Sequence, residues 1–156
     1  MHTATILLGS NIDPEINIKK AIDCLKKECV LIKTSRLWET EAIGSDGPDF
    51  LNLAIEIETP LMENDLKYQV LRKLEKDLGR VRTEDKYAPR PIDLDIIIFD
   101  NLVVDQDLWK RSFISSPISD LIPDLRHPSN KKTLLEISRE LQNSAFARIY
   151  ERTNLN

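Results

Sequence analysis

The chain has 156 residues, of which 41% are hydrophobic and 31% are charged. This composition is typical of a globular protein that buries its own core, so we expect residues 1–156 to form a single domain. The formal net charge of −4 argues against a general nucleic-acid or anionic-membrane surface. No apolar run approaches the roughly 20 residues of a membrane helix, and no signal segment is recognisable. We therefore expect a cytoplasmic protein, in which Cys24 and Cys29 are free thiols.

The first element in chain order is an apolar run at 3–8, which predicts a buried strand followed by a turn at Gly9-Ser10-Asn11. Asp13 then predicts a helix cap, with Pro14 at the first helical position. The elements expected after this helix are a strand at 30–38, a loop at 39–49, a strand at 50–58, a helix at 61–78 ending at Gly79, a charged loop at 80–91, a strand at 92–99, a short strand at 103–104, and helices at 116–122 and 133–146.

The order of the main elements is strand, helix, strand, strand, helix, strand. This order predicts an α+β fold, a ferredoxin-like βαββαβ antiparallel sheet with helices packed on one face and a helical C-terminal extension. The same fold serves many functions, so the function has to be argued from the residues of the site.

Two carboxylates stand at the start of the predicted strand 92–99, in Asp93-Leu94-Asp95. Residues two apart in a strand point to the same face and lie about 7 Å apart, so these charges repel each other. A magnesium ion held by the two carboxylates and by substrate phosphates would relieve the repulsion. The plainer alternative is a solvated start of the strand.

The loop before this acid pair carries four basic residues, Arg80, Arg82, Lys86 and Arg90. Guanidinium groups beside a metal-binding acid pair suit a polyphosphate, because the transfer of a phosphoryl group needs positioning and neutralisation of charge. A long polar loop is also typical of a lid that closes over ATP. The alternative is a solvated basic loop that pairs with the acids. No Gly-rich loop of the P-loop or protein-kinase type is present.

Six motifs, taken together, resemble one known family. Gly79-Arg-Val-Arg82 and Pro89-Arg-Pro-Ile-Asp-Leu-Asp95 look like the signature of the 6-hydroxymethyl-7,8-dihydropterin pyrophosphokinases. The other motifs similar to that family, in the same order along the chain, are Gly9-Ser10-Asn11, Trp38-Glu39-Thr40, Pro48-Asp49-Phe50-Leu51-Asn52 and Arg111-Ser112-Phe113.

The resemblance implies an ATP-dependent enzyme of folate biosynthesis that transfers diphosphate to the hydroxymethyl group of the pterin and releases AMP. Asp93 and Asp95 would bind two Mg²⁺ ions, and these acids with Arg82 and Arg90 are the implied catalytic residues. The implied ATP-binding residues are Glu75, Arg80, Arg82, Arg90 and Arg111. The implied pterin-binding residues are Thr40, Glu41, Ile43, Phe50, Asn52 and Phe113, with the two phenylalanines on opposite faces of the ring. The partners expected are small molecules alone, and we expect a monomer.

The chain departs from the family in the segment before Arg111, which is shortened and lacks a Pro-His-Pro histidine that contacts ATP in the family. Trp109 and Lys110 are the candidates to replace that histidine. Two alternatives remain open: a pyrophosphokinase for a related pterin, such as a methanopterin-type precursor, and a weakened pterin- or nucleotide-binding module. A regulatory or RNA-binding ferredoxin-like domain is disfavoured by the net charge and by the lack of an aromatic-rich strand motif.

Overall fold

A computed structural model describes residues 1–42, 47–80 and 90–151 of the chain. In these residues the strands form one sheet in the order β6-β5-β1-β4-β3-β7, and β2 pairs with the other end of β4. Every pairing in the sheet is antiparallel. The strands are β1 His2–Ser10, β2 Val30–Thr34, β3 Trp38–Thr40, β4 Phe50–Thr59, β5 Asp93–Phe99, β6 Leu102–Val103 and β7 Ala147–Ile149.

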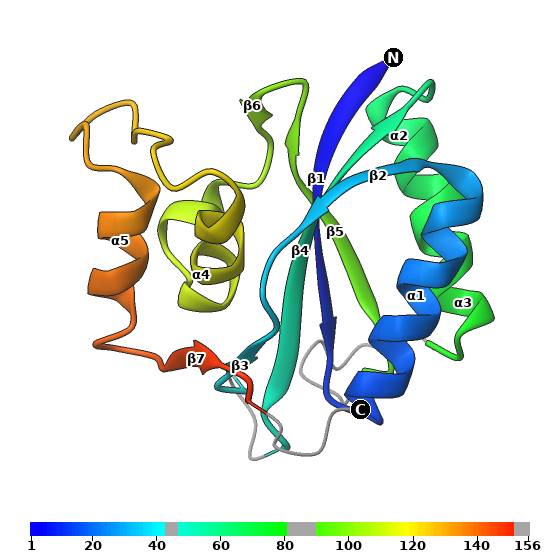
Figure 1. Cartoon of the computed structure of the whole chain (residues 1–156), viewed down its shortest axis with the longest axis horizontal. Helices are drawn as coiled ribbons and strands as arrows, with labels where there is room; N and C mark the ends of the chain where they lie inside the picture. Colours follow the sequence, from blue (N-terminus) through cyan, green and yellow to red (C-terminus); the bar gives the residue numbers. More distant parts are fainter. Residues whose placement is uncertain (43–46, 81–89, 152–156) are drawn as a thin grey trace.

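Helices cover both faces of this sheet, as Figure 1 shows. On one side lie α1, α2 and α3, and on the other lie α4 and α5. The helices are α1 Pro14–Glu28, α2 Glu63–Asp65, the π-helical segment η1 Leu66–Leu71, α3 Arg72–Asp77, the 3-10 turn η2 Gln106–Trp109, α4 Ser112–Leu121 and α5 Leu134–Leu141. The predicted α+β class, the ferredoxin-like strand order and the helical C-terminal extension are confirmed. The helices of the βαββαβ unit share one face as expected, and the extension packs on the second face, which the sequence had not predicted.

The pattern of apolar residues explains why both faces need cover. In β1, Ile6 and Leu8 face the core under α1 and α3, and Leu7 between them faces the core under α4. Successive strand residues point to opposite faces, so a strand that is apolar throughout requires two layers of helices. Ile97 of β5 and Ile118 of α4 belong to the second core and are completely buried.

The register of the central strands places one residue, Gly9, between two parts of the predicted site. Gly9 lies opposite Asn52 of β4 on one side and opposite Asp93 of β5 on the other. The acid pair and the predicted pterin-binding residues therefore meet at the same end of the sheet.

The strand expected at 30–38 is divided into β2 and β3, with a break at residues 35–37. The break is held by Asp120 of α4, whose carboxylate accepts hydrogen bonds from the Arg36 backbone (3.0 Å), the Arg36 guanidinium (2.7 and 3.1 Å) and the Trp38 indole (3.0 Å). The Ser35 hydroxyl accepts a further bond from the Ala54 amide, at 2.8 Å. These contacts direct β3 toward α4, which a pattern within the segment could not show.

Three other local predictions differ from the structure. The helix expected at 133–146 ends at Leu141 as α5, and the residues after it form β7, which had not been expected. The helix expected at 116–122 begins earlier, at Ser112. Asp13 stands before α1 with Pro14 as expected, but its side chain makes no capping hydrogen bond, because its φ of 40° places it in the left-handed region.

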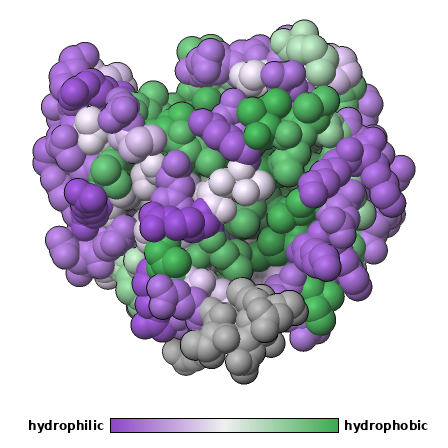
Figure 2. Space-filling view, in the orientation of Figure 1, coloured by the Kyte–Doolittle hydropathy of each residue, from purple (hydrophilic) through white to green (hydrophobic). Residues whose placement is uncertain are grey.

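The outer edge of β2 exposes apolar side chains. Val30 is 52% exposed and Ile32 is 45% exposed. Figure 2 shows hydrophobic surface across the part of the molecule where β2 crosses in Figure 1, between more hydrophilic flanks. In the described ranges no helix is long and apolar enough to cross a membrane.

Candidate active site

The acid pair lies at the start of β5, where Asp93 and Asp95 are the first and third residues. Asp93 and Asp95 flank Leu94, which is completely buried in the core, so the two carboxylates share the opposite face, as the strand pattern predicted. The side chain of Asp93 is 18% exposed and that of Asp95 is 42% exposed. Asp95 therefore offers the more open carboxylate.

Two arginines from the ends of the charged loop bind Asp93. The Arg80 guanidinium donates to one carboxylate oxygen of Asp93, and Arg90 Nη1 donates to the other at 2.9 Å. The backbone of Arg90 is fixed as well, because its amide donates to Asn11 Oδ1 at 2.6 Å and its carbonyl accepts from the Asn11 amide at 3.1 Å. Arg82 and Ile43, two other predicted site residues, lie outside the described residues.

A buried carboxylate, Glu75 of α3, organises the floor of the site. Only 2% of this residue is exposed. Its Oε2 accepts hydrogen bonds from the Leu94 amide (2.7 Å), from Arg80 (3.1 Å) and from Arg72 (3.1 Å). Glu75 was predicted to bind ATP, and in this geometry its charge is directed at protein groups. Its contact with the nucleotide stays a prediction.

Arg72 is a member of the site that the sequence analysis did not identify. Its guanidinium donates to Glu75 and to the Leu94 carbonyl (2.9 Å), and Nη2 lies 3.5 Å from Asp95 Oδ1. The available signal was the three-residue spacing between Arg72 and Glu75 on a helix. That spacing is so common on solvated helix faces that it does not single out a site. Asn11 belongs to the predicted turn Gly9-Ser10-Asn11, and that turn pattern does not predict its bonds to Arg90.

The arginines separate the ionisation behaviour of the two acids. Burial opposes the charge on Asp93, but Arg80 and Arg90 outweigh it and lower the pKa of this carboxyl below its usual value. Partial burial, followed by the charge of Asp93, raises the pKa of Asp95 to about 7. The site therefore carries one firmly charged carboxylate and one that ionises near neutral pH.

The donor set is compatible with magnesium in one specific way. The described residues contain no group of three or more His, Cys, Asp or Glu side chains that could hold a metal ion. Mg²⁺ commonly takes one or two carboxylates and completes its octahedron with water and substrate phosphates. Asp93 and Asp95 match that pattern.

On the other side of Gly9, two predicted pterin-binding residues are in direct contact. The Thr40 hydroxyl donates to Asn52 Oδ1 at 2.5 Å, and Asn52 Nδ2 donates to the Leu8 carbonyl at 3.4 Å. Thr40 is 1% exposed and Asn52 is 3% exposed. A Cβ on Gly9 would lie 2.8 Å from Asn52 Nδ2, so only glycine leaves room for the amide here.

The remaining predicted residues surround this buried pair. Phe50 is half-buried and approaches Gly9, since one of its ring carbons would lie 3.8 Å from a Cβ at that position. Glu41 is exposed where β3 ends. Phe113, near the start of α4, packs against the second core, next to the exposed Arg111. The sandwich of a pterin between Phe50 and Phe113 stays a prediction.

The shortened segment before Arg111 forms β6 and η2. Among the described residues the buried Trp109 indole N–H has no hydrogen-bond partner, and the ring meets His127 edge-on with centroids 5.0 Å apart. Because this N–H is directed into the protein, it does not favour Trp109 as a replacement for the histidine, although the residue as a whole is half-buried. Lys110 is exposed and remains a candidate.

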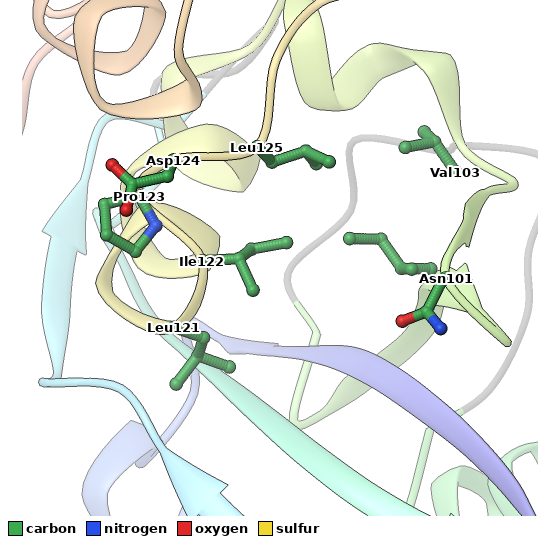
Figure 3. A pocket seen from close by; sticks show the side chains of 8 residues that line it. Asn101, Val103, Leu121, Ile122, Pro123, Asp124 and Leu125 are labelled. Carbon is green, nitrogen blue, oxygen red and sulfur yellow. The ribbon is translucent and has the colours of Figure 1, made fainter.

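A pocket of about 360 Å³ lies elsewhere, between the β5–β6 hairpin and the segment after α4. Figure 3 shows Ile122 and Leu125 on one wall facing Val103 on the other. Ile98, the residue of β5 that lines the pocket, is five positions beyond Asp93, or about 17 Å along the strand. The pocket is therefore separate from the acid pair.

Paired carboxylates and several arginines at one end of an α+β sheet are typical of an enzyme that handles a polyphosphate. The comparison with protein families then gives the particular family. The model described as "7,8-dihydro-6-hydroxymethylpterin-pyrophosphokinase (HPPK)" matches residues 5–123. The chain belongs to this family, which confirms the family and the enzyme class that the sequence motifs indicated.

Relatives of known name agree with this assignment. The chain is 32% identical over 150 residues to a 2-amino-4-hydroxy-6-hydroxymethyldihydropteridine pyrophosphokinase of Aquifex aeolicus, covering 90% of this chain and 92% of the relative. It is 38% identical over 128 residues to a folate synthesis bifunctional protein of Arabidopsis thaliana, covering 75% of this chain and 26% of the relative. The chain thus spans about a quarter of the length of such bifunctional relatives.

Solved structures show the same fold. The HPPK-DHPS protein of Plasmodium falciparum, in a crystal structure with SDX-DHP, superposes with a TM-score of 0.69 at 14% identity, covering 92% of this chain and 44% of that chain. At this identity the likeness establishes the fold alone.

Proposed function

We propose that the chain transfers a diphosphate group from ATP to the hydroxymethyl group of 6-hydroxymethyl-7,8-dihydropterin, with release of AMP, as a step of folate synthesis. ATP is the co-substrate used by the family. The observation that carries the proposal is that Gly9 lies between Asn52 and Asp93 in the sheet. A pterin beside Asn52 and a polyphosphate beside Asp93 would then be neighbours.

In the reaction the hydroxymethyl oxygen of the pterin attacks the β-phosphorus of ATP. The bond between this phosphorus and the oxygen that bridges to the α-phosphate breaks, AMP leaves, and the hydroxyl proton passes to water. The described residues offer no evident strong base beside the acid pair, so positioning and neutralisation of charge carry the catalysis.

Asp93 and Asp95 are the residues that would hold Mg²⁺, and two such ions would neutralise the attacking and leaving oxygens. The phosphate oxygens would then accept hydrogen bonds from the guanidiniums of Arg80, Arg90 and Arg72. In the structure Arg80 and Arg90 bind Asp93. Phosphate oxygens accept two hydrogen bonds from one guanidinium, so a polyphosphate would compete for these arginines as the cation engages the carboxylates. Arg82 and Arg111 complete the proposed phosphate contacts.

The pterin would bind on the other side of Gly9. Asn52 offers both a donor and an acceptor to the edge of the ring. The Thr40 hydroxyl fixes the orientation of this amide, because it donates to Oδ1. Phe50 and Phe113 would contact the ring faces, and Glu41 and Ile43 would line the rim.

The decisive experiment is an incubation of the protein with ATP, Mg²⁺ and 6-hydroxymethyl-7,8-dihydropterin, followed by chromatography of the nucleotides and mass spectrometry of the pterin. The proposal expects AMP and a diphosphorylated pterin in equal amounts. ADP with a monophosphorylated pterin would refute it, and so would the absence of any product. An Asp93→Asn protein is the matched control for contaminating activity.

The arrangement of residues 1–156 as one domain, the monomeric state and the cytoplasmic location stay predictions. Light scattering after size exclusion tests the monomer directly.

A further inference from the structure

The C-terminal strand contacts one wall of the proposed pterin site. β7 pairs with β3, and Ala147 lies opposite Thr40. The pairing extends beyond both strands, because the Glu41 amide donates to the Phe146 carbonyl at 3.4 Å and the Tyr150 amide donates to the Leu37 carbonyl at 2.8 Å. β7 therefore covers the outer edge of the short strand that carries Thr40.

Ala145, the residue just before Phe146, contacts the start of α4, which carries Phe113 of the proposed pterin site. The Ser112 hydroxyl donates to the Ala145 carbonyl at 2.7 Å. Ser112 is 4% exposed and is the first residue of α4, between Arg111 and Phe113. The adjacent carbonyls of Ala145 and Phe146 thus accept hydrogen bonds from two different parts of the proposed site. One donor is Ser112 at the start of α4, and the other is Glu41 at the end of β3.

We propose that residues 145–148 are a bridge that sets the separation between β3 and α4, and that Ser112 and Arg148 are positioning residues for pterin binding. The inference rests on the proposed function, and it adds residues 145–148, which lie beyond the 5–123 match to the family. The bridge acts through Thr40 and Phe113 and does not touch the substrate itself.

The geometry favours a bridge built from backbone bonds. β3 has three residues, and an exposed strand edge this short is held weakly unless a second strand covers it. The side-chain contacts of Arg148, an ion pair with Glu39 and a stack at 4.9 Å on Phe146, involve a side chain that is 66% exposed. Exposed pairs of this kind contribute little, so the Ser112 bond and the β3–β7 ladder carry the positioning.

The first test compares two serines of α4 with the same burial. Ser112→Ala removes the bond to Ala145, whereas Ser119→Ala removes a hydroxyl that is also 4% exposed but donates within the helix, to Ser116 at 2.7 Å. Calorimetric titration with 6-hydroxymethyl-7,8-dihydropterin should show binding weakened about three- to tenfold by Ser112→Ala and less than twofold by Ser119→Ala. Ser112→Thr retains the hydroxyl and should restore most of the affinity.

The second test uses proline at two adjacent positions of β7. The bonds of Glu41 to Phe146 and of Tyr150 to Leu37 fix the alternation of the ladder, so the Arg148 amide points toward β3 and the Ile149 amide points away. Arg148→Pro removes a ladder donor, whereas Ile149→Pro is the matched control on an edge strand. Only Arg148→Pro should raise the KM for the pterin, while the KM for ATP stays within twofold.

Each result separates this inference from the proposed function. If the wild-type protein binds the pterin and forms AMP, but the test variants match their controls, the bridge is wrong and the function stands. If ATP and pterin affinities fall together in Ser112→Ala, the role is general stability and the inference also fails. A wild-type chain that does not bind the pterin overturns both.

Discussion

The carboxylate of Glu75 and the backbone amide of Leu94 share a hydrogen bond of 2.7 Å, which ties α3 to the residue between the two site aspartates. Because Glu75 also accepts from Arg72 and Arg80, it fixes the backbone of β5 and two guanidiniums at once. Glu75, which the resemblance implies to bind ATP, thus holds the other charged groups of the site in place.

Glu75→Ala should lower the free energy of unfolding by about 3–5 kcal/mol, because two arginines and a buried amide lose their common acceptor. Glu75→Gln keeps an acceptor for Leu94 and should cost about 1–3 kcal/mol. Urea unfolding followed by circular dichroism measures both. Equal losses for the two variants would contradict the role of the charge.

The two site aspartates should differ in stability although both are needed for turnover. Asp93→Asn breaks two arginine contacts and should destabilise the protein, whereas Asp95→Asn relieves repulsion and should stabilise it slightly at pH 8. Each variant should reduce AMP formation at least about a hundredfold. Thermal unfolding without added magnesium measures the stability of each variant, and the activity assay measures its turnover. A shift of both melting temperatures in the same direction would contradict the predicted difference.

The pKa of Asp95, raised from 3.8 to about 7, predicts a pH dependence of folding. Between these values the folded state keeps a proton that the unfolded state has released. The contribution of Asp95 to stability is therefore full below about pH 4 and is lost as the pH rises toward 7. Asp95→Asn cannot titrate, so its stability relative to wild type should increase over this range. Since the side chain is 42% exposed, the pKa shift and the total change in stability should be smaller than those of a fully buried group. A difference that is flat from pH 4 to 8 would contradict the assignment.

Gly9→Ala should separate pterin binding from ATP binding. The new Cβ would come within 2.8 Å of Asn52 Nδ2, and the amide cannot yield freely because Thr40 and Leu8 hold it. We expect about tenfold weaker pterin binding, a loss of about 1–3 kcal/mol in stability, and an unchanged affinity for ATP. Calorimetric titration of each ligand tests this, and equal weakening of both ligands would count against the position of the pterin.

The missing histidine predicts weak ATP binding beside ordinary pterin binding. A lost hydrogen bond to a charged phosphate costs about 1–3 kcal/mol, or about tenfold to a hundredfold in affinity. Replacing 103–110 with a longer segment that carries Pro-His-Pro should recover about tenfold of ATP affinity. Tight ATP binding that is lost in Lys110→Ala would instead show that this exposed lysine has taken over the contact.

Those parts of the site that lie on regular strands could be predicted from the sequence. The common face of Asp93 and Asp95 follows from strand alternation, and the same rule places Leu94 in the core. The parts set by contacts between distant segments could not be predicted. In the sequence, Arg72 is one of several charged residues on its helix. Only the packing of this helix beside β5 singles it out as a residue of the site. β7 has three residues and no clear alternation, and its position depends on bonds from Glu41 and Ser112, which are remote in sequence.

The π-helical turn Leu66–Leu71 has a consequence for how this region can change in length. The Arg72 amide donates to the Lys67 carbonyl, five residues back, so the helix holds one residue more than a regular α-helix would over the same rise. Such a turn absorbs an insertion without rotating α3, the helical segment on its C-terminal side. Deletion of Tyr68, which is 63% exposed, would restore an ordinary helix and still aim Arg72 and Glu75 at the sheet. Homologous chains could therefore gain or lose a residue here while the floor of the site keeps its orientation.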